Sequence, residues 1–220
     1  EAPPPPPTQP PELPSVAVEV VEPSPSAEPT PTPTPEPVYE PIAAVTVTTA
    51  QLRDGSAAQA VAAAGGNALV VEMKGIKGRL AWQSQAELAA ALWANAADDL
   101  TAQAVRELAA NTDLYLVARI QCFRDPLMSS GWVGSLMTRG GNLWHDAQGV
   151  GWSSPASREA ADYLSQLCLE LADMGFDEIL LDSAGYPDSG EVNVLAVNDN
   201  RPEDRTVPVA AFWARLSEEL

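Results

Sequence analysis

Short apolar runs alternate with longer segments of helical period along residues 42–220. Runs rich in Val, Ile and Thr predict strands, and apolar positions that recur every three to four residues predict amphipathic helices. The strand pattern occurs in Ile42–Thr49, Ala68–Lys74, Leu114–Ile120 and Glu178–Asp182. The helical pattern occurs in Ser56–Ala64, Asp98–Ala110, Ala156–Met174 and Val209–Glu219.

Strict alternation of strands and helices demands a parallel sheet with right-handed crossovers. We therefore expect an α/β fold of TIM-barrel-like (β/α) repeats, comprising about the first four β/α units. Four units are half of a (β/α)8 barrel, and they could also form a small doubly wound sheet. A half-barrel leaves apolar edges exposed, so we expect a homodimer or pairing with a missing C-terminal half.

The N-terminal residues 1–41 differ from the rest in composition. They hold 16 of the 21 prolines and contain no Lys or Arg. A segment of this kind cannot bury enough apolar surface to fold, so we expect a disordered, extended acidic linker ahead of a domain at 42–220. Such a stalk is typical of a secreted protein attached to the cell envelope, and we expect that a signal or lipoprotein segment preceded Glu1.

Charge and cysteine content limit the partners. The net charge of -18 argues against nucleic acid and against an anionic membrane, since both require a basic face. No apolar run is long enough to span a bilayer. The two cysteines, Cys122 and Cys168, are expected to be buried rather than bridged, and no Cys or His spacing indicates a metal site. We expect no cofactor.

Asp182 ends the fourth predicted strand. The preceding helix should stop near Gly175, and the apolar run Ile179–Leu181 favours a buried strand. Carboxyl ends of parallel strands open onto the ligand site, so Asp182 is a candidate catalytic group. The alternative is a carboxylate that caps the next loop.

Other charged residues lie inside apolar strand segments. Period-2 alternation puts Glu72 and Lys74 on one face of the second strand, and Arg119 lies near the end of the third. Buried charges require partners, so we expect these three residues and Asp182 to converge in a polar network, either as a site or as a structural salt-bridge cluster. Asp125 follows the third strand and has the same two interpretations, active-site carboxylate or loop cap.

The region Gln121–Pro155 is longer than most connections, and long loops are often functional. Its aromatic and polar side chains include Trp132, Asn142, Trp144, His145, Asp146 and Trp152. Aromatic rings can stack on sugars while polar neighbours bind hydroxyl groups, which favours carbohydrate binding. Alternatively, the tryptophans form a small core for the loop.

Several segments in this order resemble the bacterial putative glycoside hydrolase domain, a family with a TIM-barrel fold. The matching segments are residues 67–74, 78–82, 115–126, 141–146, 151–152 and 175–182. The resemblance implies a secreted or envelope-attached, α-amylase-like barrel, with Asp182 at the position of a fourth-strand nucleophile or base. The chain departs from the family pattern at Gly75, at Ser154 and at Ser183–Gly185, where the family carries polar site residues.

The resulting enzyme hypothesis is a glycosidase that acts on an extracellular or cell-envelope polysaccharide through strand-end carboxylates. Asp182 would be catalytic, with Glu72 or Asp125 as its partner. The substrate-binding candidates are Lys74, Arg119, Trp144, His145, Asp146 and Trp152. The alternatives are a non-catalytic carbohydrate-binding module and a structural protein of the cell envelope.

Overall fold

The computed structural model describes residues 41–196 and 205–220. The linker expected at residues 1–41 lies outside this part of the chain except for Pro41. The strands are β1 Ala44–Val47, β2 Ala68–Lys74, β3 Tyr115–Gln121 and β4 Glu178–Asp182. The helices are α1 Thr49–Arg53, α2 Ala57–Ala63, α3 Glu87–Ala91, α4 Leu100–Asn111, α5 Pro126–Ser130, α6 Arg158–Met174 and α7 Thr206–Glu219, with a short 3-10 helix, η1, at Val192–Val194.

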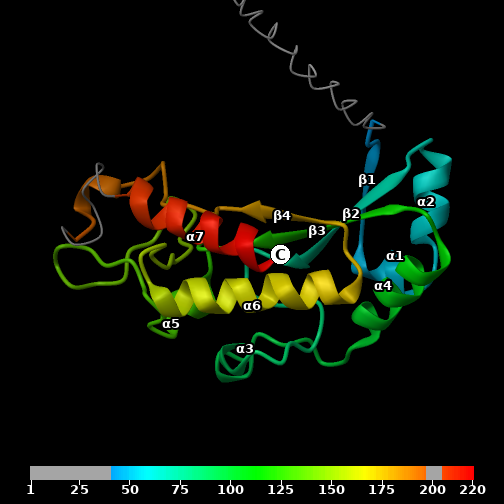
Figure 1. Cartoon of the computed structure of the whole chain (residues 1–220). Coiled ribbons are helices and arrows are strands. Elements are labelled where there is room, and N and C mark those ends of the chain that lie inside the picture. Colours follow the sequence, from blue (N-terminus) through cyan, green and yellow to red (C-terminus); the bar gives the residue numbers. More distant parts are fainter. Residues whose placement is uncertain (1–40, 197–204) are drawn as a thin grey trace, which may run out of the picture. The chain divides into compact units, whose positions relative to one another are not determined.

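The four strands form one parallel sheet in the order β1-β2-β3-β4. This consecutive order confirms the predicted α/β fold built of (β/α) units. Right-handed crossovers between consecutive strands place their helices on the same face, whereas a doubly wound sheet reverses its order to cover both faces. Helix α6, from the crossover between β3 and β4, contacts α4 from the preceding crossover, and Figure 1 shows α7 running alongside α6. The consecutive strand order and the contact between helices of successive crossovers are those of consecutive (β/α) units.

One face of the sheet forms the core with the helices. Leu69 and Val71 of β2, and Leu116 and Ile120 of β3, are all buried on this face. Helix α6 faces them with a buried apolar stripe that consists of Leu164, Leu167 and Leu171. Burial of this apolar stripe is the main contribution of α6 to stability.

The opposite face, here called the open face, carries the residues that alternate along each strand with those of the core face. Thr46, Glu72, Arg119 and Leu180 are exposed on it. The expected strand at residues 179–181 is present, with Ile179 and Leu181 partly buried against the core, but Leu180 is 41% exposed, so the expectation of burial is wrong for that residue. Among the described residues β4 pairs only with β3 and β1 only with β2, which leaves two free edges. The expected pairing with a second copy or a further segment stays a prediction.

Helix caps explain where several elements begin and end. Thr48 and Gln51 form a capping box that starts α1, which ends the first strand earlier than its Thr-rich sequence predicts. Ser157 caps α6 by accepting a hydrogen bond from the Ala160 N–H. Gly175 ends α6 in the left-handed region at a φ of 105°, as the sequence predicts.

Candidate functional site

Asp182 lies at the carboxyl edge of the open face. Arg119 donates from Nε to Asp182 Oδ2 at 2.5 Å, and Gln121 donates from Nε2 to the same oxygen at 3.1 Å. The Asp182 side chain is 28% exposed, so the carboxylate is oriented by the protein and is accessible to a ligand. The expected convergence of Arg119 and Asp182 is therefore present.

The chain turns sharply just after Asp182. Ser183 has a φ of 51°, an uncommon value for a residue other than Gly, and such strained conformations collect at functional sites. Its Oγ donates to Gln121 Oε1 at 3.1 Å, which fixes the amide whose other end holds Asp182. Sequence reasoning missed Gln121 and Ser183. The alternation that placed Arg119 also places Gln121 on the same face, so that signal was available for Gln121.

Glu72 is the second carboxylate of the open face. It is paired in register with Arg119 on β3 but makes no ion pair with it. Its Oε1 lies over the next loop, where a Cβ on Gly75 would be only 2.6 Å away. A pocket of about 390 Å³ opens beside it, lined by Glu72, Lys77 and Arg79 among others. Gly75 thus leaves room for the Glu72 carboxylate next to a pocket with two cations.

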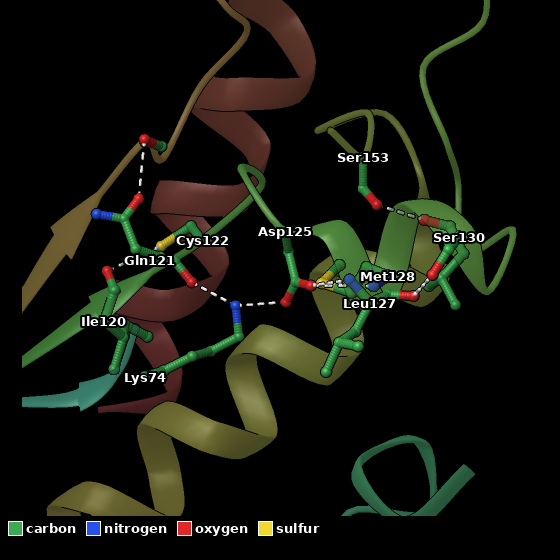
Figure 2. A network of polar contacts seen from close by, with 11 residues as sticks. Lys74, Ile120, Gln121, Cys122, Asp125, Leu127, Met128, Ser130 and Ser153 are labelled. Atoms are coloured by element: carbon green, nitrogen blue, oxygen red, sulfur yellow. Dashed lines mark hydrogen bonds and ion pairs between the residues drawn. The ribbon is translucent and has the colours of Figure 1, made fainter. Parts of the chain in front are cut away.

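Lys74 does not join this group. The pairing of β2 with β3 shifts between Glu72 and Lys74, so Lys74 pairs with Ile120, a core residue, instead of Gln121. Figure 2 shows its amine between the Gln121 carbonyl, at 2.5 Å, and the carboxylate of Asp125, at 2.6 Å. The expected four-residue network is thus divided, because one extra residue in the strand reverses the direction of the lysine.

Asp125 caps α5 while it binds Lys74. Its Oδ1 accepts from the N–H groups of Leu127 and Met128 at 2.7 and 3.0 Å, and its Oδ2 faces Lys74. Both charged side chains are fully buried. This geometry matches the alternative of a loop cap, and it leaves neither residue accessible to a substrate.

Two of the three tryptophans of the long loop, Trp144 and Trp152, form a core. Trp144 and Trp152 are buried, with ring centroids 6.5 Å apart in an edge-to-face arrangement. Trp144 donates from Nε1 to the Glu191 carbonyl at 3.0 Å. These rings are therefore not exposed as sugar platforms, which corresponds to the alternative given above. His145 is exposed and pairs by a backbone bridge with Gly151.

Asp146 organises this loop core. Its Oδ2 accepts from Arg124 Nε at 2.7 Å and from Trp152 Nε1 at 3.1 Å, and its Oδ1 accepts from the N–H groups of Gln148 and Val150. Burial alone would raise the pKa of Asp146, but these hydrogen bonds outweigh it and hold the pKa below its usual value. Sequence reasoning missed Arg124, and no sequence pattern indicated this pairing.

At the rim of the loop, Ser154 and Tyr186 share a hydrogen bond of 3.2 Å.

Within residues 41–196 and 205–220, no cluster of three or more His, Cys, Asp or Glu side chains could hold a metal ion. In the same residues, no helix is both long and apolar enough to cross a membrane.

Comparison with known proteins extends these observations. Residues 42–220 match the model of a family described as a putative glycosyl hydrolase domain. A hypothetical protein from Ruminiclostridium thermocellum has a similar solved structure, with a TM-score of 0.69 at 22% sequence identity. That match covers 80% of this chain and 92% of the solved chain, and at this identity it shows the fold alone. No curated protein matches the chain.

Proposed function

The chain belongs to the putative glycosyl hydrolase domain family, and on this premise we propose that it hydrolyses a polysaccharide outside the cell through carboxylates at its strand ends. Family membership implies a carbohydrate substrate. The proposal rests on one observation above all, the oriented and accessible carboxylate of Asp182 at the carboxyl edge of the sheet.

Glu72 is the better partner for Asp182. A glycosidase needs two carboxyl groups, one of which donates a proton. Asp125 is fully buried against Lys74, whereas Glu72 is exposed beside a pocket. Glu72 is level with Leu180 across β3, and Asp182 lies two residues further along β4, so the backbones of Glu72 and Asp182 are about 12 Å apart. This separation is nearer to the spacing of inverting pairs, roughly 6.5 to 9.5 Å, than to the shorter spacing of retaining pairs.

The two carboxylates suit different roles. Asp182 accepts hydrogen bonds from a guanidinium and an amide, which position it as the base that activates water. Glu72 has no such donors among the described side chains and is available as the proton donor. Arg119 lies between them and balances the charge. The proline-rich segment before residue 42 would hold the domain away from the cell envelope, in keeping with an extracellular substrate.

The second candidate function is glycan binding without hydrolysis. It is favoured by the openness of the site, because the open face is solvated and Glu72 and Asp182 stand on opposite sides of Arg119. An open face of this kind can hold a sugar chain without bringing an acid to the scissile bond.

The test is a panel of soluble and insoluble polysaccharides, including cell wall, assayed for both retention of the protein and release of reducing ends. We expect release by the wild-type chain and a loss of at least about 100-fold in Asp182→Asn. Glu178→Gln is the matched control, because Glu178 lies on the same strand and face but at the opposite end, where its Oε2 accepts from Tyr115. It should retain the activity of the wild type.

Each outcome separates the candidates. Release that persists in Asp182→Asn would contradict the proposed role of Asp182. Retention without release from any polysaccharide would support the binding module instead. Because Asp182 is partly exposed, its removal should change the free energy of unfolding by less than about 1 kcal/mol, so a loss of activity would not reflect unfolding.

A further inference from the structure

Two tryptophans outside the candidate site expose most of their surface to solvent, more than Trp213, which is 44% exposed. Trp93 is 80% exposed and Trp132 is 65% exposed, whereas Trp82, Trp144 and Trp152 are buried. Neither exposed ring packs on another aromatic ring in the described residues. Large apolar side chains in this state do not stabilise the fold by burial and require another explanation.

Trp93 follows the end of α3 and has a φ of 56°. Its N–H donates to the Ala90 carbonyl at 3.0 Å, and the next residue, Ala94, donates to the Ala89 carbonyl at 2.8 Å. This pair of hydrogen bonds is a Schellman motif, in which the left-handed position is usually a glycine. Ala94 is buried, so the motif turns the chain into the core and leaves the indole outside.

Trp132 repeats this arrangement at the end of α5, with a φ of 61°. Its N–H donates to the Ser129 carbonyl at 3.2 Å, and Val133 donates to the Met128 carbonyl at 2.9 Å. Val133 is buried, as Ala94 is. Two turns distant in sequence thus use the same geometry to present a tryptophan to solvent.

The left-handed conformation has a cost at both positions. For a residue with a Cβ it amounts to about 1–2 kcal/mol, which glycine would avoid. Here the strain is not offset by burial of the ring. Strained residues that the rest of the structure holds in place point to function.

The two turns are in contact and are anchored. Leu92, next to Trp93, packs so closely on Gly131, next to Trp132, that a Cβ on that glycine would be 2.4 Å from Leu92 Cδ2. Arg79 Nη1 donates to the Trp93 carbonyl, and Arg79 also lines the pocket beside Glu72. The backbones that carry the two exposed rings are therefore fixed and adjacent, and Arg79 links that of Trp93 to the pocket beside Glu72.

We propose that Trp93 and Trp132 form a paired stacking platform for the pyranose rings of a neutral polysaccharide. The indole face matches the apolar C–H face of a sugar, and a rigid aromatic ring binds with little loss of conformational freedom. The net charge of -18 disfavours a polyanionic chain. This inference rests on the proposed function and extends it, since the platform would hold the polymer whose bond lies at the strand ends.

The test measures retention on the neutral members of the polysaccharide panel, with thermal unfolding of the same variants. We expect Trp93→Gly and Trp132→Gly each to weaken retention about tenfold and the double variant to lose it. Because glycine relieves the left-handed strain, the Tm of each variant should stay unchanged or rise by about 2–4 °C. Trp213→Ala is the control for an exposed indole, as Trp213 is 44% exposed on α7, and it should retain wild-type binding.

Several results would overturn the proposal. Undiminished retention of the double variant would do so, as would a large fall in its Tm, which would mark the rings as structural. Loss of self-association in the double variant, with no retention of the wild type on any neutral glycan, would identify a protein interface instead. Release of reducing ends that depends on Asp182 but not on either tryptophan would leave the proposed function standing and remove the platform. Retention that depends on both tryptophans, without any release of reducing ends, would support the platform and contradict the proposed hydrolysis.

Discussion

Lys74 and Asp125 form an ion pair of 2.6 Å between side chains that are 0% and 1% exposed. The pair joins the end of β2 to the start of α5, because Asp125 also caps that helix. A buried ion pair adds little stability compared with apolar residues, but loss of one partner leaves an uncompensated charge in the core. The pair therefore fixes how the long loop leaves the sheet.

Removal of this lysine should be costly. We predict that Lys74→Met lowers the free energy of unfolding by about 3–5 kcal/mol, because Asp125 stays buried without its cation. Urea denaturation measures this change. Lys77→Met, at an exposed lysine three residues away, should change stability by less than about 0.5 kcal/mol. Equal stabilities for the two variants would show that the pair does not stabilise the fold.

Asp146 should make the loop core sensitive to acid. Its folded pKa is lowered, so its stabilisation is complete above the unfolded value of about 3.9 and is lost as the pH falls through the lower folded value. Asp146→Asn should cost about 2 kcal/mol at pH 7, and its deficit relative to the wild type should shrink below about pH 4. Denaturation curves from pH 7 to pH 2 test this. Asp188→Asn, at an exposed position, should follow the wild type throughout.

The cysteines should be unreactive in the folded protein. Cys122 and Cys168 are free and fully buried, and burial raises the pKa of both thiols, that of Cys168 to about 12. Since only the thiolate reacts, we predict no alkylation at pH 8 until denaturant unfolds the chain, when both cysteines react. Ser130→Cys supplies an exposed thiol as the positive control. Rapid labelling of either native cysteine would contradict the packing described here.

Substitution of Gly134 separates the cost of a steric clash from the cost of backbone strain. It has a φ of 58°, and a Cβ there would lie 2.0 Å from the Cβ of Ser157, the residue that caps α6. Gly149 has a similar φ of 75° but open space around it. We predict that Gly134→Ala destabilises the protein by about 3 kcal/mol and Gly149→Ala by about 1 kcal/mol. Equal losses of stability, measured by thermal unfolding, would mean that the contact with Ser157 relaxes without cost.

The periodic elements were predictable from the sequence, and the short ones were not. The bounds of β2 and β4 agree with the apolar runs that predicted them. Helices α1, α3 and α5 have five residues each, too few to repeat an apolar position more than once. Their existence depends on caps and tertiary contacts, as at Thr48 and Asp125.

Within the candidate site, alternation correctly placed Arg119 and Asp182 together because both lie in regular strand. Alternation predicted the wrong face for Lys74, because a β-bulge adds one residue to the strand before it and no residue type in the sequence indicates the bulge. Among the tryptophans, the sequence analysis included the exposed Trp132 in the long loop, but also the buried Trp144 and Trp152, and it did not single out Trp93. Exposure at Trp93 and Trp132 depends on two left-handed turns, and glycine, the usual signal for such turns, is replaced there.

The division of the sheet into a helix-covered face and an open face has a consequence for tolerance to substitution. Adjacent residues along a strand tolerate different substitutions. Ala118 packs against helices, for example, whereas Arg119 is exposed to solvent. In a library of all single substitutions, scored separately for protein abundance and for glycan turnover, the effect of substitution should therefore alternate between successive positions of β3. Substitutions at even-numbered positions would lower abundance, and substitutions at odd-numbered positions near the carboxyl end would lower turnover alone.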